Sequence, residues 1–238
     1  MSAMRGERYA VYWTPDPVHP LWRAGCDWLG RDPEAALDLA SPPVGAQRAA
    51  AARYGFHATL KAPFRLAAGT APEQLFDAVG ELAARRADFQ MPPLQVDWLD
   101  DFLALRPAGP LPAHHALRRL ADDCVAALDG LRAPATPAER TRHAATLDGD
   151  AERLSLLARW GYPHVFEAWR FHMTLGDRFA ERSGDAARAF ESEACRHFAA
   201  SLDVPLRCSA LSVFHEPGVG QAFRLIRRLP LASGESPR

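Results

Sequence analysis

The sequence lacks the features that mark several common classes of protein. Its 238 residues contain a single lysine, Lys61, and 28 basic residues against 29 acidic ones leave a net charge of −1. Without a basic surplus, binding to long nucleic acid or to an anionic membrane is not expected. No apolar run approaches the ~18 residues of a membrane span, and Met1–Glu7 lacks the charged-then-apolar order of a signal peptide. These absences predict a cytoplasmic protein.

Cysteine is also scarce. The four cysteines lie far apart and form no C-x-x-C pair: Cys26, Cys124, Cys195 and Cys208. A disulfide framework and a zinc site are therefore not expected, and we interpret the four as reduced, mostly buried side chains. His114 and His115 are adjacent, but neighbouring residues on a helix diverge by ~100°, which does not suit one shared metal ion. The sequence predicts no metal site and no cofactor.

Strand and helix patterns alternate along the chain. Aromatic and β-branched runs bounded by turn residues predict strands over 8–14, 54–64, 94–97, 102–106, 166–175, 206–215 and 221–231. Apolar residues at helical period predict helices near 21–29 and over 71–88, 117–128, 151–160 and 184–202. A loop of small residues is expected over 41–52. The mixture predicts an α+β fold.

One short pattern occurs twice. Residues 56–60 read Phe-His-Ala-Thr-Leu and residues 171–175 read Phe-His-Met-Thr-Leu. Because side chains alternate along a strand, His and Thr share one face of each segment and the apolar residues share the other. Each segment can therefore bury one face and present an imidazole and a hydroxyl on the other.

The repeated pattern divides the chain into two similar halves. Thr70 follows His57 at the same spacing as Asp185 follows His172, and each marks the start of an expected helix. We predict a single bilobal domain over 1–238, with two pseudo-symmetric lobes that each have an antiparallel sheet backed by helices. Lobe 1 spans about 8–110, a helical connecting insert spans about 112–162, and lobe 2 spans about 163–232.

The two His-x-Thr motifs, one in each half, resemble those of the two-histidine (2H) phosphoesterase superfamily. The run from Arg53 to Phe64, with residues 171–175, is similar to the branch associated with phosphonate-utilisation genes. The resemblance covers nearly the whole chain and implies a central cleft and metal-independent chemistry on cyclic phosphates. It assigns catalytic roles to four residues: His57, Thr59, His172 and Thr174. The long helical insert departs from a minimal member of the superfamily.

Proton-transfer chemistry independently gives these residues a role. In-line hydrolysis of a cyclic phosphodiester needs a base on the attacking water and an acid on the leaving alkoxide. Imidazole titrates near neutral pH, so one histidine can serve as base and the other as acid. Threonine hydroxyls can donate to the non-bridging phosphate oxygens.

Strand alternation also suggests residues that bind substrate. Lys61 lies on the face of His57 if the strand is regular to that point, and Arg170 shares the face of His172. Tyr12, Phe214 and Arg224 come from expected neighbouring strands. For each of the five, a structural role is the alternative.

The leading hypothesis is a cyclic phosphodiesterase that acts on a small ribose-based cyclic phosphate. The phosphonate branch implies phosphoribosyl 1,2-cyclic phosphate as that substrate. One alternative is a nucleotide or RNA-end 2′,3′-cyclic phosphodiesterase, and another is a non-catalytic module that binds a phosphorylated ligand. The sequence leaves the oligomeric state and the assignment of acid and base open.

Overall fold

Two main antiparallel sheets organise the chain. The computed structural model describes residues 6–38 and 45–234. The larger sheet has the order β11-β10-β1-β4, formed by β1 (Arg8–Trp13), β4 (Ala58–Phe64), β10 (Ala210–Glu216) and β11 (Arg224–Pro230). The smaller has the order β6-β7-β8, formed by β6 (Leu94–Leu99), β7 (Phe102–Pro107) and β8 (Met173–Thr174). Two minor ladders pair β2 (Arg31–Asp32) with β3 (Leu37–Asp38), and β5 (Phe89–Gln90) with β9 (Arg207–Cys208).

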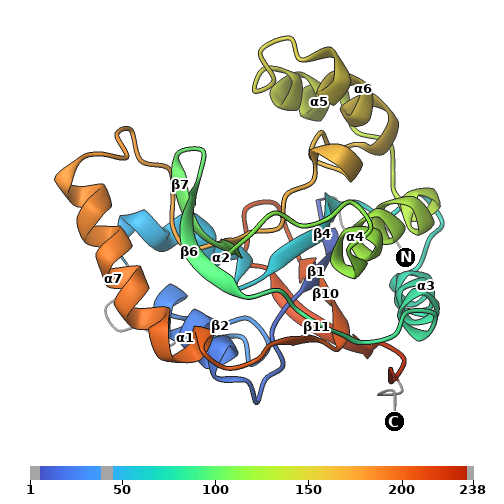
Figure 1. Cartoon of the computed structure of the whole chain (residues 1–238). Coiled ribbons are helices and arrows are strands. Elements are labelled where there is room, and N and C mark those ends of the chain that lie inside the picture. The colour runs from blue at the N-terminus through green and yellow to red at the C-terminus, as the bar shows by residue number, and fades with distance from the viewer. Residues whose placement is uncertain (1–5, 39–44, 235–238) are drawn as a thin grey trace.

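Helices surround these sheets, which confirms the α+β class (Figure 1). Their bounds are α1 (Pro20–Leu29), α2 (Ala49–Tyr54), α3 (Pro72–Ala84), α4 (Ala116–Ala127), α5 (Pro137–Ala144), α6 (Ala151–Trp160) and α7 (Asp185–Leu202). α3 and α4 pack on the larger sheet, whereas α7 packs on β6 and on α1. α5 and α6 pack on each other and project from the rest of the molecule (Figure 1). None of the helices described is both long and apolar enough to cross a membrane.

The alternation predicted for the two motifs is confirmed. In the first, Phe56, Ala58 and Leu60 are buried, while the histidine and threonine between them are half-buried. In the second, Phe171, Met173 and Leu175 are buried in the same way. Both motifs therefore fix one face in the apolar core and leave the other face to a cavity.

The stretch before the first motif differs from the prediction. The sequence predicts a loop over 41–52 and a strand from residue 54, but 46–48 form a 3₁₀ turn and 49–54 form α2. Four consecutive alanines begin α2, and alanine is the strongest helix former. Residues 41–44 lie outside the described residues. His57 consequently lies in the turn between α2 and β4.

The strand predicted over 166–175 is also shorter than expected. Only β8 pairs, through Thr174 with Ala104 and Met173 with Leu105 of β7. Phe166 has a φ of 53°, which interrupts an extended chain, and residues 166–168 form a 3₁₀ turn. His172 therefore lies just before its strand, as His57 does.

Most other predicted elements are confirmed with small changes of length. The predicted helix over 71–88 begins at Pro72 and ends at Ala84. Thr70 is expected to mark its start, but the residue that caps the helix is Ala71, whose N–H donates to the side chain of Gln74. The extended runs near 94–106 and 206–231 form the hairpins β6–β7 and β10–β11.

Candidate functional site

The two histidine motifs meet in one cavity. β4 and β8 contact each other where the two sheets adjoin, and Nε1 of Trp169 donates to the carbonyl O of Thr59 at 2.9 Å. All four motif residues line a cavity of about 260 Å³: His57, Thr59, His172 and Thr174. A space of this size suits a small ligand. The structure therefore brings together the four residues predicted to be catalytic.

Both imidazoles are held in the same tautomer. Nδ1 of His57 lies 2.8 Å from the carbonyl O of Gly55, and Nδ1 of His172 lies 2.8 Å from the carbonyl O of Arg170. A carbonyl oxygen only accepts, so each Nδ1 carries a proton. Nε2 is then the basic nitrogen of each neutral ring, and Thr59 Oγ1 lies 3.3 Å from that atom of His57.

Burial keeps the two imidazoles neutral. It lowers the pKa of His57 to about 4, an effect opposed by the hydrogen bond to Gly55 and reinforced by the charge of His172. Burial likewise lowers the pKa of His172, where the charge of Arg170 adds to the effect. At neutral pH both Nε2 atoms can accept a proton, and an anion bound between the rings would favour protonation.

An aromatic wall supports the first histidine. The ring of Tyr12 stacks on that of His57, with centroids 3.8 Å apart and 23° between the planes. Tyr12 also lines the cavity, whereas Phe214 is buried behind it at a centroid distance of 4.9 Å. Burial raises the pKa of the Tyr12 phenol well above its usual value, which leaves the hydroxyl neutral.

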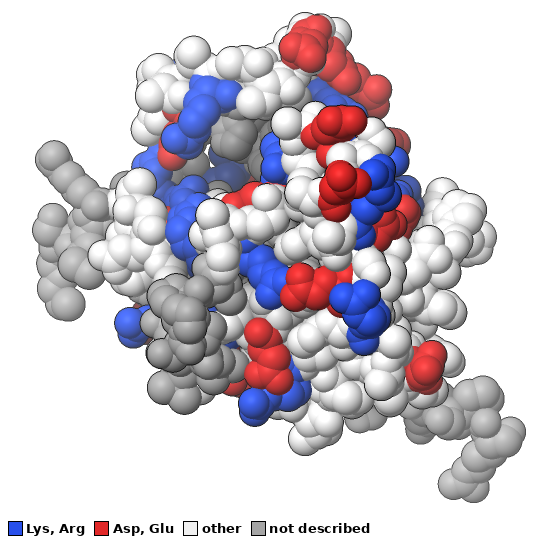
Figure 2. Space-filling model, turned by 90° about the vertical axis from the view of Figure 1, so that its left-hand side faces the viewer, with Lys and Arg blue, Asp and Glu red and all other residues white. Residues whose placement is uncertain are grey.

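Two further hollows adjoin this cavity. One of about 550 Å³ also contacts His57 and Thr174, and one of about 400 Å³ also contacts Thr59 and His172. The three hollows share lining residues, and we refer to them together as the cleft. In the space-filling view, charges of both signs are mixed over the α7 side, and basic side chains border a recess in its upper half (Figure 2).

The structure does not place Lys61 on the face of His57. The register between β1 and β4 shifts between the pairs Tyr12–Thr59 and Val11–Lys61, which breaks the alternation. Lys61 is 4% exposed, and its Nζ donates to the carbonyl O of Val125 in α4 at 3.1 Å. The expectation that it faces the cleft is wrong because it required a regular strand.

The two predicted arginines differ in position. Arg170 lines the hollow next to His172 and forms an ion pair with Asp100 at 2.9 Å. Arg224 is exposed at the start of β11 and lines none of the three hollows. Of these two arginines, only Arg170 is therefore placed to contact a ligand in the cleft.

Other lining residues carry no recognisable sequence pattern. Those around the central cavity include Arg8, Tyr54, Gly161 and Tyr162. They come from β1, α2 and the turn after α6, and they are brought together only by tertiary packing. Among the residues that the structure describes, no group of three or more His, Cys, Asp or Glu side chains is placed to hold a metal ion.

Comparison with known proteins places the chain in a family. The model of the family described as "Protein of unknown function (DUF1045)" matches residues 59–224. Two curated relatives are both named ribose 1,5-bisphosphate phosphokinase PhnN. The protein from Janthinobacterium sp. (strain Marseille) is 39% identical over 241 residues, which covers 97% of this chain and 52% of the relative. The protein from Laribacter hongkongensis (strain HLHK9) is 40% identical over 225 residues, covering 92% and 51%.

These names contradict the predicted activity. A phosphokinase transfers a phosphoryl group, so the relatives are not named as hydrolases, and the expected cyclic phosphodiesterase is wrong on this finding. The chain spans about half the length of each relative. The names of the relatives therefore describe proteins about twice as long as this chain.

Proposed function

The chain belongs to the DUF1045 family, and we propose that it binds a phosphorylated ribose in the cleft between its two histidines and transfers protons at the phosphate. The relatives named for ribose 1,5-bisphosphate support the ligand class. Those names also support the expected connection to phosphonate metabolism. The identity of the sugar phosphate and the cytoplasmic location stay predictions.

One observation carries the proposal. Both imidazoles donate through Nδ1 to a backbone carbonyl and line the same cavity, so each ring keeps a basic Nε2, which at His57 lies 3.3 Å from Oγ1 of Thr59. A phosphate between them accepts hydrogen bonds after either ring takes up a proton. Thr59 and Thr174 line the same cavity and can donate to the remaining phosphate oxygens.

We infer that the nucleotide site of a phosphokinase does not lie in this chain. P-loop kinases hold ATP through G-x-x-x-x-G-K-[ST], whose lysine follows a glycine. Lys61, the single lysine of the sequence, follows Leu60 and precedes Ala62. In this proposal the chain binds the sugar phosphate and not the nucleotide.

We also propose that the two sheets correspond to the predicted pseudo-symmetric lobes and that the resemblance to the two-histidine superfamily extends to the fold. Each motif histidine precedes a strand and bonds to the carbonyl of the residue two positions before it. Such matched local geometry supports a repeat. The lobe boundaries stay predictions, and α4, which the prediction assigned to the insert, packs on β4.

Isothermal titration tests the proposed ligand. We expect ribose 5-phosphate to bind the chain, with uptake of protons near pH 6 because bound phosphate raises the pKa of both neutral imidazoles. Titrations in buffers of different ionisation enthalpy measure that uptake. ATP should give no saturable heat.

Substitutions of histidine supply the control. His57→Gln and His172→Gln should each weaken ribose 5-phosphate at least about tenfold. His114→Gln, which changes an exposed histidine, should leave the affinity unchanged. The proposal would be contradicted if His57→Gln, His172→Gln and His114→Gln bound ribose 5-phosphate with equal affinity. It would also be contradicted if the parent protein bound ATP more tightly than ribose 5-phosphate.

A further inference from the structure

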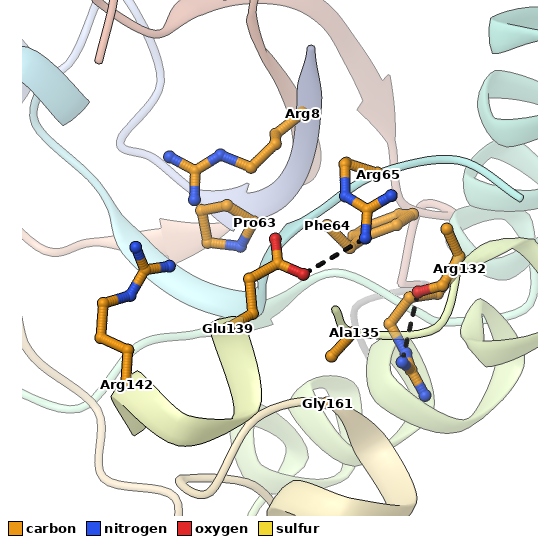
Figure 3. Close-up of a pocket in the computed structure, with 10 residues that line it drawn as sticks. Arg8, Pro63, Phe64, Arg65, Arg132, Ala135, Glu139, Arg142 and Gly161 are labelled. Atoms are coloured by element: carbon orange, nitrogen blue, oxygen red, sulfur yellow. Dashed lines mark hydrogen bonds and ion pairs between the residues drawn. The ribbon is translucent and has the colours of Figure 1, made fainter. Parts of the chain in front are cut away.

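Next to the histidine cavity lies a small pocket rich in arginine. The arginine pocket has a volume of about 50 Å³, and its charged residues are Arg8, Arg65, Arg132, Arg142 and Glu139 (Figure 3). It adjoins the histidine cavity, because Arg8, Pro63 and Gly161 line both. None of the four motif residues, His57, Thr59, His172 and Thr174, lines it.

The carboxylate nearest Arg8 does not fully neutralise it. Glu216 is buried and forms ion pairs with Arg8 at 2.5 Å and with Arg53 at 2.8 Å. One negative charge is therefore shared by two guanidinium groups. Only Nε of Arg8 makes that contact, and Arg8 also lines the arginine pocket and the histidine cavity.

The opposite side of the pocket has the same imbalance. Asp129 pairs with Arg132 at 3.0 Å and with Arg159 at 3.1 Å. Arg65 pairs with Glu139 at 3.2 Å, and the contact is drawn in Figure 3. Each carboxylate near the pocket thus has at least one arginine partner already.

Arg142 adds a charge that no carboxylate balances. It extends from α5 toward the side of the pocket that holds Arg8 and Glu139 (Figure 3). Among the residues that the structure describes, it forms no ion pair. The pocket consequently contains a surplus of positive charge on a partly enclosed surface.

Charge, geometry and size together favour a phosphate group. Guanidinium groups bind phosphate oxygens through paired N–H donors. A volume of about 50 Å³ suits a group of the size of one phosphate. At Gly161, a Cβ would lie 2.8 Å from Nη1 of Arg132, so the backbone of residue 161 packs directly against this guanidinium.

We propose that the arginine pocket binds the second phosphate of a ribose bisphosphate whose first phosphate lies between His57 and His172. This inference rests on the proposed function for the first phosphate. The ribose then lies against Pro63 and Gly161, which border both cavities. The arginine pocket selects a bisphosphate over a monophosphate.

Two variants of one helix test the assignment. Arg142→Gln removes the unpaired charge, whereas Arg140→Gln removes an exposed arginine of α5 that bonds to the carbonyl O of Ala135 and does not line the pocket. In titrations with ribose 1,5-bisphosphate, we expect Arg142→Gln to weaken binding at least about tenfold and Arg140→Gln to change it less than about twofold.

Inorganic phosphate tests the pocket without the histidine site. In a His57→Gln/His172→Gln double variant, phosphorus-31 NMR should still detect binding of inorganic phosphate. Addition of Arg142→Gln to this variant should abolish the binding. The inference is overturned if Arg142→Gln and Arg140→Gln bind the bisphosphate equally, or if phosphate binding does not depend on Arg142. Failure of the proposed function is a different result, in which bisphosphate affinity is insensitive to His172→Gln.

Discussion

At the scale of single residues, burial sets the proton affinity of the site. Two imidazoles share one cavity, and each lies largely out of bulk water with neutral partners: a backbone carbonyl at each Nδ1, and the Thr59 hydroxyl at Nε2 of His57. Desolvation disfavours the charged ring, and each ring also disfavours a charge on the other. Both rings can therefore accept protons when an anion enters the cleft.

The stability of the protein should fall on acidification because of His57. Its folded pKa of about 4 lies below the unfolded value of 6.5, so between these pH values the unfolded chain binds the extra proton. The stabilising contribution is complete above about pH 6.5 and is lost as the pH falls to 4. The loss should reach ~2–3 kcal/mol.

Urea unfolding at pH 7 and pH 4.5 measures this effect. His57→Gln, which cannot be protonated, should show a flatter dependence on pH than the parent protein. His114→Gln is the matched control and should follow the parent. Parallel curves for the parent and His57→Gln would show that the folded imidazole titrates normally.

At the scale of the element, the irregular register of β4 changes the role of its lysine. Lys61 donates to Val125 in the last turn of α4, where carbonyl groups lack helical partners and the helix dipole favours a cation. Burial lowers the pKa of this ammonium to about 8, with the charge of Asp129 opposing the shift. The lysine thus stabilises the packing of α4 on β4.

Lys61→Met should lower stability without weakening ligand binding. The loss of one charged hydrogen bond predicts a decrease of ~1–2 kcal/mol in the free energy of unfolding at pH 7. The affinity for ribose 5-phosphate should change less than about twofold. Thr59→Val, on the cavity side of the same strand, should show the reverse pattern. Weaker binding by Lys61→Met at unchanged stability would place the lysine in the site after all.

At the scale of the whole molecule, the site exists only where the two sheets adjoin. β4 of the larger sheet carries the first motif, and β8 of the smaller carries the second. The indole of Trp169 donates to Thr59 across this junction, which couples the positions of the two motifs. The relative placement of the histidines is therefore a property of sheet docking.

Trp169→Phe should weaken both the fold and the site. Loss of the bond to Thr59 should lower the free energy of unfolding by ~1–2 kcal/mol and reduce the affinity for ribose 5-phosphate. Trp98→Phe is a matched control, because Trp98 donates to Glu191 at 3.0 Å between β6 and α7, away from the cleft. Denaturation measures the stability of both variants, and titration measures their affinity for ribose 5-phosphate. If Trp169→Phe and Trp98→Phe changed the affinity equally, the Trp169 contact would have no specific role in the site.

The two His-x-Thr motifs do not by themselves determine which reaction the protein catalyses. Two histidines that transfer protons at a phosphate suit more than one reaction, and a fold or motif does not by itself decide among them. The sequence led to a hydrolase through resemblance, whereas the curated relatives are named as phosphokinases. The predicted burial of one face of each motif does not depend on that choice, because it comes from the alternation of side chains along an extended backbone.

Local periodicity determined the elements and the buried faces of both motifs. Alternation along an extended backbone needs no knowledge of distant residues, so Phe56, Leu60, Phe171 and Leu175 were correctly predicted to be buried. Only the tertiary structure decided the register of β4 on β1, which directs Lys61 toward α4. It also decided the assembly of the arginine pocket from segments far apart in the chain. Strand pairing and sheet docking depend on contacts between residues far apart in the chain, which no local pattern records.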